Sequence, residues 1–338
     1  LPANRRCPLF VYLCRANQQH MAATGTDVFE AKRLLEAGAV VGIPTETVYG
    51  LAGNAFDAKA VARIFQVKNR PSFDPLIVHS DSLEKISRFV EDVPPLARKL
   101  AGAFWPGALT LLLPKKPVIP DLVTAGLDTV AVRMPNHPLT RELLGLLDFP
   151  LAAPSANPFG YISPTRAEHV EAQLGGLIPY ILDGGPCQVG VESTIVGFMD
   201  GRPVVYRLGG LPLEGIEAIV GPAEVRPHST SNPLAPGMLK SHYAPRKPLF
   251  IGGYDFLKTQ YPPEQIGYLG FDRMKDNLPT DNQILLSPRR DYAEAARHLF
   301  AALRHLDALP VAVICAELLP EEDLGRAIND RIRRAAAK

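Results

Sequence analysis

Hydrophobic residues along the first two hundred positions follow two recurring arrangements. Apolar side chains at helical spacing mark residues 27–37, which stop at Gly38, and residues 57–67. Short continuous apolar runs, typical of buried strands, separate the helical segments. Further helices are predicted at residues 83–89, 95–104, 139–147 and 165–174, and Ser163-Pro164-Thr165 is the predicted cap of the last one. Strands are predicted at residues 39–43, 76–78, 109–113, 129–135 and 180–182. This alternation predicts an α/β domain.

The pattern changes in the second half of the chain. Residues 193–198 and 204–207 are predicted to form a hairpin around Asp200-Gly201. Residues 228–248 are rich in Pro, Ser, Gly and Asn and predict a linker. Beyond it, strands at 249–251, 266–269, 284–286 and 311–315 and helices at 292–306 and 324–336 predict a small parallel, Rossmann-like α/β domain. No Gly-x-Gly-x-x-Gly turn follows its first strand, so no dinucleotide site is predicted there.

Length and composition favour a soluble protein of two domains. The chain has 338 residues, of which 46% are hydrophobic and 21% charged, and a net charge of +1. This charge excludes a global basic field for nucleic acid but not a local RNA-binding patch. Four scattered cysteines indicate a reducing compartment, hence the cytoplasm, without disulfides or a zinc site. No apolar run is long enough to span a membrane.

These patterns divide the chain into four parts. Residues 1–20 are expected to be a non-native or disordered extension, because Met21 has the appearance of a natural start. Residues 24–215 are the predicted catalytic domain, 216–247 the linker or lid, and 248–338 the C-terminal α/β domain.

Polar residues stand where the predicted strands begin or end. They are Thr45, Glu46, Thr47, His79, Thr129, Arg133, Ser155, Asn157, Ser193, Thr194 and Arg207. Each alone has an ordinary explanation, such as a turn or a satisfied buried histidine. Because ligands of α/β sheets bind outside strand ends, the whole set predicts one pocket.

Four cations belong to this set or lie near it. Lys68 and Arg70 stand between a helix and a strand, and Arg133 and Arg207 end strands. Guanidinium groups suit phosphate and carboxylate oxygens, so the inventory fits a triphosphate and a small carboxylate-bearing substrate. There is no Walker loop, and side chains would therefore have to hold a nucleotide.

The motifs that contain these residues resemble those of the Sua5/YrdC/YciO family, the L-threonylcarbamoyladenylate synthases. The resemblance covers about residues 24–215 and rests on Lys68-x-Arg70, residues 44–51, 75–79, 104–107, 129–135, 154–157 and 190–195, and Arg207. The linker, with Pro236-Gly237-Met238 and His242-Tyr243, and the C-terminal segment are similar to the longer Sua5 subtype. The resemblance implies an α/β fold with a YrdC-like open twisted sheet, a large cationic cavity and a smaller C-terminal domain.

The resemblance also implies an activity, that of a nucleotidyltransferase. L-Threonine, bicarbonate or CO₂, and ATP with Mg²⁺ would give threonylcarbamoyl-AMP and pyrophosphate. The product would pass to the tRNA threonylcarbamoyl-transfer machinery for modification of adenosine 37, with at most a weak direct tRNA contact and no membrane association.

Residue by residue, the resemblance implies three groups. The catalytic signature is Lys68, Arg70, Ser155 and Asn157. ATP would be bound by Arg70, Asp74, Thr129, Ser155, Ser163, Arg207 and Tyr243. L-Threonine would be bound by Thr47, His79, Arg133, Ala153 and Ser193. Two departures stand out: Asp74 where many relatives have asparagine, and Ala235 where the linker usually has serine.

Three other functions are possible for a chain with these features. A hydrogenase-maturation carbamoyltransferase with a related domain is disfavoured because this chain has no Cys-x-x-Cys. A non-catalytic RNA-binding module of the YrdC fold is weakened by the near-neutral charge. A purely structural pair of domains leaves the arginines and hydroxyls at strand ends unexplained.

Overall fold

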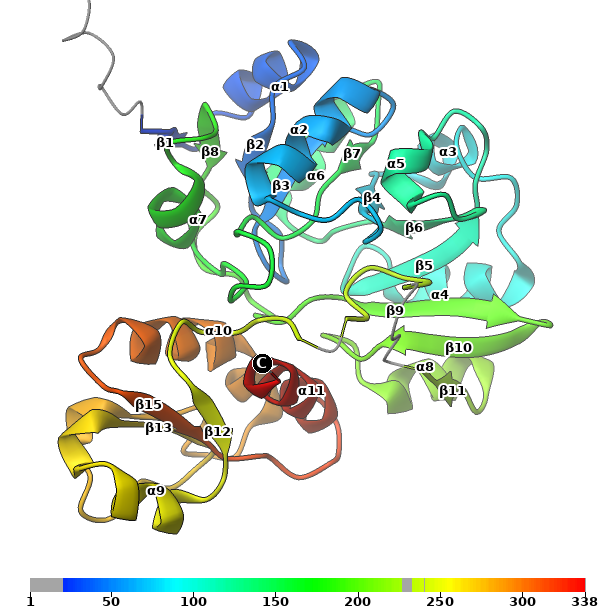
Figure 1. Ribbon diagram of the computed structural model, residues 1–338. Helices are drawn as coiled ribbons and strands as arrows, with labels where there is room; N and C mark the ends of the chain where they lie inside the picture. Colours follow the sequence, from blue (N-terminus) through cyan, green and yellow to red (C-terminus); the bar gives the residue numbers. More distant parts are fainter. Residues whose placement is uncertain (1–20, 227–232, 240, 338) are drawn as a thin grey trace, which may run out of the picture.

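The structure is a computed structural model that describes residues 21–226, 233–239 and 241–337. Two α/β bodies lie one against the other, each with its own sheet (Figure 1). The prediction for residues 1–20 falls outside the described residues. No helix in the described ranges is both long and apolar enough to cross a membrane.

The first body contains one mixed sheet of eleven strands in the order β1-β8-β2-β3-β7-β4-β6-β5-β9-β10-β11. Its strands are β1 Ala23–Gly25, β2 Val41–Ile43, β3 Gly50–Asn54, β4 Ile77–His79, β5 Leu109–Pro114, β6 Thr129–Arg133, β7 Leu151–Ala152, β8 Tyr180–Leu182, β9 Thr194–Met199, β10 Arg202–Arg207 and β11 Glu224–Val225. The predicted hairpin is confirmed, because β9 and β10 pair antiparallel around Asp200 and Gly201.

Helices of the first body lie where the sequence predicted them, except that α5 and α8 were not predicted. They are α1 Val28–Glu36, α2 Ala58–Lys68, α3 Leu83–Ser87, α4 Pro95–Phe104, α5 Asp121–Thr124, α6 Pro138–Leu146, α7 Ala167–Leu174 and α8 Leu213–Val220. Asp57 caps α2 by accepting a hydrogen bond from the Lys59 amide at 2.9 Å. The cap predicted for α7 is wrong: its N-cap residue is Arg166, which makes no side-chain cap bond.

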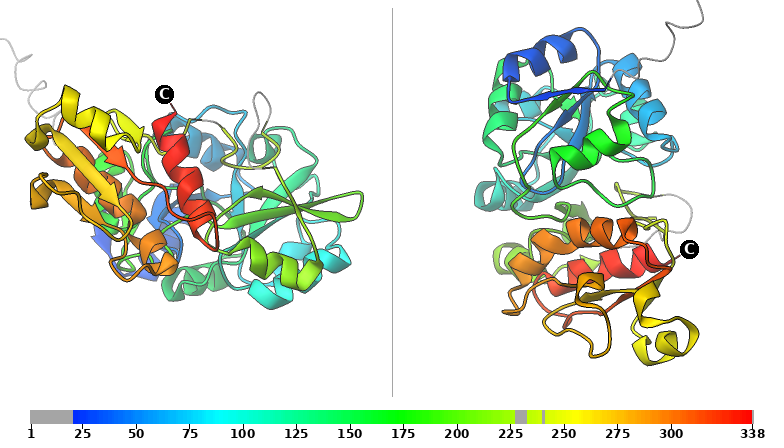
Figure 2. Two further views of the ribbon diagram at one scale, coloured as in Figure 1. Left: turned by 90° about the horizontal axis from the view of Figure 1, so that it is seen from below. Right: turned by 90° about the vertical axis from the view of Figure 1, so that its left-hand side faces the viewer.

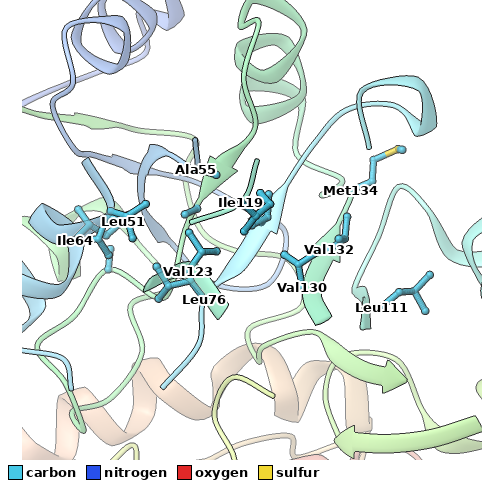
Figure 3. Packing of buried hydrophobic residues seen from close by; sticks show 14 of the residues in the cluster. Leu51, Ala55, Ile64, Leu76, Leu111, Ile119, Val123, Val130, Val132 and Met134 are labelled. Atoms are coloured by element: carbon cyan, nitrogen blue, oxygen red, sulfur yellow. The ribbon is translucent and has the colours of Figure 1, made fainter. Parts of the chain in front are cut away.

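The two faces of the central strands are covered differently. Val130 and Val132 point into the main hydrophobic core, which also contains Leu76 (Figure 3). Val78 of β4 belongs to the same core. Because side chains alternate along a strand, Ile77 and Ala131 point the other way. There they pack against Ala235 and Met238 of the linker instead of a helix. The linker therefore covers the face of the sheet from which the polar residues of β4 and β6 project.

The second body is a parallel four-stranded sheet in the order β12-β15-β13-β14, as the sequence predicted. Its elements are β12 Leu249–Ile251, α9 Tyr254–Gln260, β13 Ile266–Gly270, β14 Gln283–Leu285, α10 Tyr292–Ala308, β15 Val313–Ala316 and α11 Gly325–Ala336, with short 3₁₀ helices at Pro263–Gln265 and Thr280–Asn282. Helices α10 and α11 cover the side that faces the first body, and α9 covers the opposite side (Figure 2).

The two bodies meet closely at Gly190. This residue has a φ of +81°, and a Cβ there would lie 2.4 Å from the Cα of Arg297 on α10. A side chain would push the helix away, so glycine is required by both the backbone conformation and the close approach. This contact fixes α10 beside the segment that leads into β9.

Candidate functional site

A cavity lies between the first sheet and the linker. Its lining includes many of the predicted site residues: Thr47, Arg70, His79, Arg133, Ala153, Ser155, Ser193, Arg207 and Tyr243. The linker contributes Pro236, Gly237 and His242 as well. The cavity volume is about 50 Å³, room for a few water molecules but not for a nucleotide.

The cavity extends over a face of the sheet as well as its strand ends. His79 and Arg133 end the parallel strands β4 and β6, where they stand opposite each other. Ile77 also lines the cavity from the start of β4, and Ser155 pairs with Gly50 in an isolated bridge. The prediction of a pocket outside strand ends is therefore only partly right, because the linker closes the cavity from above the sheet.

Arg133 is held by three groups at the inner end of the cavity. Its guanidinium forms an ion pair with Glu46 at 2.7 Å and donates to the Thr47 hydroxyl at 2.8 Å. Its Nε donates to the carbonyl of Gly107 at 3.2 Å. Thr47 in turn shares a 2.8 Å hydrogen bond with Thr45. Such a fixed guanidinium can receive a carboxylate without first losing side-chain freedom.

Arg207 and Ser193 form a second fixed group. Arg207 donates from Nε to the Ser193 carbonyl at 2.9 Å and from a terminal nitrogen to the Ser193 hydroxyl at 3.0 Å. Thr110, which sequence reasoning did not select, shares a 2.7 Å hydrogen bond with Ser193. Burial lowers the pKa of Arg207 to about 10, so it remains a cation at neutral pH.

Arg70 is fixed by the residues that follow it. It forms a 2.9 Å ion pair with Asp74 and donates to the carbonyls of Asp74 at 3.1 Å and Pro75 at 2.8 Å. Asp74 is fully buried and is not part of the cavity lining. Its other oxygen accepts from the Gly237 amide of the linker at 3.4 Å. Asp74 thus anchors Arg70 and the linker instead of facing the cavity.

Lys68 does not line the cavity, although the resemblance places it in the catalytic signature. It is buried, and its ammonium donates to the backbone carbonyls of Ser155 and Asn157. Burial and then the charge of Arg70 lower the pKa of Lys68 well below its usual value. Asn157 is also outside the cavity lining. Its side-chain amide donates to the carbonyls of Pro158 at 2.8 Å and of Tyr161 at 2.9 Å. Both side chains shape the turn that presents Ser155.

Replacing Lys68 with methionine should destabilise the protein. Two buried carbonyls would lose the hydrogen bonds that Lys68 donates, at a cost of about 2 kcal/mol in the free energy of unfolding. Urea denaturation followed by circular dichroism measures this cost. Lys59→Met, at an exposed position of the same helix, is the control and should leave the midpoint unchanged. Equal midpoints for the two variants would contradict the role given to Lys68.

Two other predicted ATP-binding residues also lie outside the lining. Thr129 shares the sheet face of Ala131 and Arg133 but stands at the opposite end of β6. Ser163 donates its hydroxyl to Glu192 at 2.6 Å. Glu192 itself lines the cavity and forms a 3.0 Å ion pair with Arg331 of α11. The second body thus contacts the cavity wall directly, a link that sequence reasoning missed.

The linker histidine and tyrosine are packed against α10 and α11. The ring of Tyr243 stacks on Phe300 at 5.3 Å, and the guanidinium of Arg334 lies 4.9 Å from it. Arg334 also donates to the carbonyl of Leu239 at 2.9 Å. Helix α11 therefore holds the linker in its place over the cavity.

Two buried histidines line the cavity. Burial and then Arg133 lower the pKa of His79 to about 3, and burial and then Arg334 lower that of His242. Both imidazoles are neutral at pH 7. Their Nδ1 atoms have no hydrogen-bond partner among the described residues. Such atoms are suited to polar groups of a bound substrate.

Two family models together match most of the chain, and known proteins are similar to it over nearly its whole length. A family model described as telomere recombination, that of Sua5, YciO and YrdC, matches residues 33–209, and one described as the threonylcarbamoyl-AMP synthase C-terminal domain matches residues 211–337. A threonylcarbamoyl-AMP synthase from Pyrococcus abyssi is 42% identical over 90% of this chain and 93% of its own length. One from Bacillus subtilis is 40% identical over 94% of both chains.

A solved structure is similar to both bodies together. The crystal structure of P. abyssi Sua5 complexed with L-threonine matches with a TM-score of 0.85 at 40% identity, and the match covers 93% of this chain and 97% of that one. The match is therefore too long for either body alone and includes residues of both.

Proposed function

The chain belongs to the Sua5/YrdC/YciO family, and we propose that it is a threonylcarbamoyl-AMP synthase that acts on L-threonine, bicarbonate or CO₂, and ATP. The observation that carries the proposal is the convergence of Thr47, His79, Arg133, Ser193 and Arg207 on one cavity. A relative of 40% identity over nearly the whole chain is named as a complex with L-threonine.

The geometry suggests how the substrates are arranged. The carboxylate of threonine suits Arg133 and Thr47, and its amine lies toward the neutral imidazole of His79. The amine in its neutral form attacks CO₂ and loses a proton, which gives a carbamate. A carbamate oxygen then attacks the α-phosphorus of ATP, and pyrophosphate leaves with the electrons of the broken P–O bond. Arg70 and Arg207 would stabilise the negative charge.

The linker has to move for ATP to enter. The cavity beneath it is far smaller than the 300 Å³ or so that a nucleotide requires. Residues 235–238 of the linker rest on the first body through the apolar side chains of Ala235 and Met238 and through two hydrogen bonds of 3.4 Å, from the Gly237 amide to Asp74 and from Arg207 to the carbonyl of Pro236. Further along, the Ala244 amide donates to the carbonyl of Gly160 at 2.8 Å. Because both hydrogen bonds at residues 235–238 are long, this part of the linker would open as a lid.

We propose that Mg²⁺ enters with the phosphates of ATP. Among the described residues no group of three or more His, Cys, Asp or Glu side chains could hold a metal ion. The phosphate oxygens of ATP would supply ligands to the ion.

The product would pass to tRNA threonylcarbamoyl-transfer machinery in the cytoplasm. A mixed anhydride of this kind hydrolyses readily, so rapid transfer is required. Direct contact of this chain with tRNA would be weak, because its net charge is only +1.

Turnover with each of the twenty amino acids tests the proposal. The full chain with ATP, Mg²⁺ and bicarbonate should release pyrophosphate with L-threonine, and far more slowly with serine or valine, which lack the methyl or the hydroxyl group. A coupled pyrophosphate assay measures the rates, and omission of bicarbonate is the control. Salt-dependent RNA binding without any pyrophosphate release would favour the RNA-binding alternative instead.

A further inference from the structure

A second cavity lies in the C-terminal body, far from the lid. It opens where β12, β13 and β15 end, between α9 and the loop that follows β13, and has a volume of about 690 Å³. This lies within the range of small-ligand sites. In parallel α/β sheets the carboxyl ends of the strands are where ligands bind. Helix α9 covers the side of the sheet that faces away from the first body, so the cavity is separate from the proposed active site (Figure 2).

Two tyrosine rings and two lysines form the walls. The rings of Tyr254 and Tyr268 lie 6.5 Å apart. The Lys258 ammonium lies 5.8 Å from the first ring, and that of Lys275 lies 5.2 Å from the second. Both lysine side chains are partly exposed, at 50% and 33%, and each pairs with a carboxylate, Lys258 with Asp255 at 2.6 Å and Lys275 with Glu317 at 3.8 Å. Because exposed ion pairs are weak, both ammonium groups can turn toward a ligand. Tyr268 is buried, so the half-buried Tyr254 supplies the aromatic face for a flat base that carries a phosphate.

The carboxylate of Glu317 completes the site. Glu317, which follows β15, accepts a hydrogen bond from the Tyr268 hydroxyl at 2.8 Å and lies 3.8 Å from the Lys275 ammonium. A carboxylate just beyond a strand of such a sheet can accept hydrogen bonds from ribose hydroxyls. The second cavity thus offers groups for a base, a phosphate and a sugar together.

The wall of this cavity is held in place by its own hydrogen bonds. The Lys275 amide donates to the Gln283 side chain at 2.7 Å, and Gln283 donates back to the Lys275 carbonyl at 3.1 Å. Tyr254 bridges from α9 to the carbonyl of Asp276 at 3.1 Å. After β12 the backbone turns through Gly252 and Gly253, both at positive φ, and neither position would place a Cβ against a neighbouring atom. A ligand can therefore approach the main chain closely there.

We propose that this second cavity binds a nucleoside monophosphate, with the base on the ring of Tyr254 and the phosphate between Lys258 and Lys275. The ribose would lie toward Glu317. A single phosphate is consistent with the absence of a Gly-x-Gly-x-x-Gly turn, which a dinucleotide would require. The proposal does not depend on the reaction proposed for the first cavity.

Hydrogen–deuterium exchange of the full chain with AMP tests this site. AMP should slow exchange in peptides that cover residues 252–258 and 271–277. Lys275→Ala should raise the AMP concentration needed for half of this protection by about tenfold, because a charged hydrogen bond is lost. Arg273→Ala is the matched control, since Arg273 is exposed on the same loop and outside the lining. It should leave the protection unchanged.

Three results would overturn the proposal. They are the absence of protection in both segments at millimolar AMP, equal protection in Lys275→Ala, and the same protection by inorganic phosphate alone, which would reduce the site to an anion site. Threonine-dependent pyrophosphate release by Lys275→Ala should match that of the parent protein. A failure of that reaction in the parent protein would count against the proposed synthase without affecting the exchange result.

Discussion

Replacing Arg70 with alanine is expected to lower kcat/KM for threonine-dependent pyrophosphate release by about 10²–10³-fold. The guanidinium lines the cavity and is held by Asp74 and by two backbone carbonyls, so it meets developing phosphate charge without rearrangement. Arg70→Lys keeps the charge but not the planar fork and should recover only part of the rate.

The ion pair with Asp74 complicates this test. Arg70→Ala leaves a fully buried carboxylate without its cation, which should also cost stability. The double variant Arg70→Ala/Asp74→Asn removes that carboxylate charge, so its urea midpoint should rise above that of Arg70→Ala while its rate stays low. Arg63→Ala, at an exposed position of helix α2 just before Arg70, is the control for both measurements. Near-normal pyrophosphate release by the double variant would contradict the proposed role of Arg70 in catalysis.

Strong local patterns predicted most of the elements. Helix α4 and strands β8 and β12 begin and end where the sequence placed them, because a proline precedes each apolar run and a proline or glycine follows it closely. Strand β3 was missed, since Gly50-Leu51-Ala52-Gly53-Asn54 has two glycines and no alternation of apolar and polar residues. Its pairing with β2 and β7 forms it, and such pairing is not a local property.

The site could be predicted as a set of residues but not as a geometry. The direction of Lys68 is set by the end of α2, where Asn69 adopts a left-handed conformation with φ 50° and turns the chain. Arg70 therefore reaches the cavity while Lys68 stays beneath it. Ion pairs with Asp74 and Glu46 offset the charges of Arg70 and Arg133, which line the cavity. The strongly cationic cavity that the resemblance implied therefore remains a prediction.

Contacts between distant segments could not be predicted at all. Glu192 and Arg331 are 139 positions apart, and no local pattern in either segment indicates that they meet. The same holds for Tyr243 and Phe300. These contacts join the cavity wall and the lid to the C-terminal body, which gives that body a structural part in the site.

Replacing Arg331 with methionine should have the largest effect on stability, a loss of about 3–5 kcal/mol. Arg331 is fully buried and contacts Glu192 at 3.0 Å, Asp330 at 2.9 Å and the Leu208 carbonyl at 2.7 Å. Methionine fills a similar space but leaves the buried carboxylates without this cation. Arg333→Met is the control, because Arg333 lies on the same helix with its ion pair in solvent.

The stability that Arg331→Met loses relative to the parent protein should become smaller as the pH falls. Burial alone would raise the pKa of Glu192, but Arg331, Arg207 and the hydrogen bond from Ser163 together hold it below its usual value. A carboxyl with a lowered pKa stabilises the fold above the pKa of the unfolded chain, about 4.3, and this stability is lost as pH falls through the folded-state value. Without Arg331 the pKa of Glu192 rises, so the variant begins to protonate this group at higher pH. Urea denaturation should therefore show the widest gap between parent and variant near pH 7 and a narrower gap toward pH 4.5. A gap of constant size would mean that Arg331 acts through packing and not through the charge of Glu192.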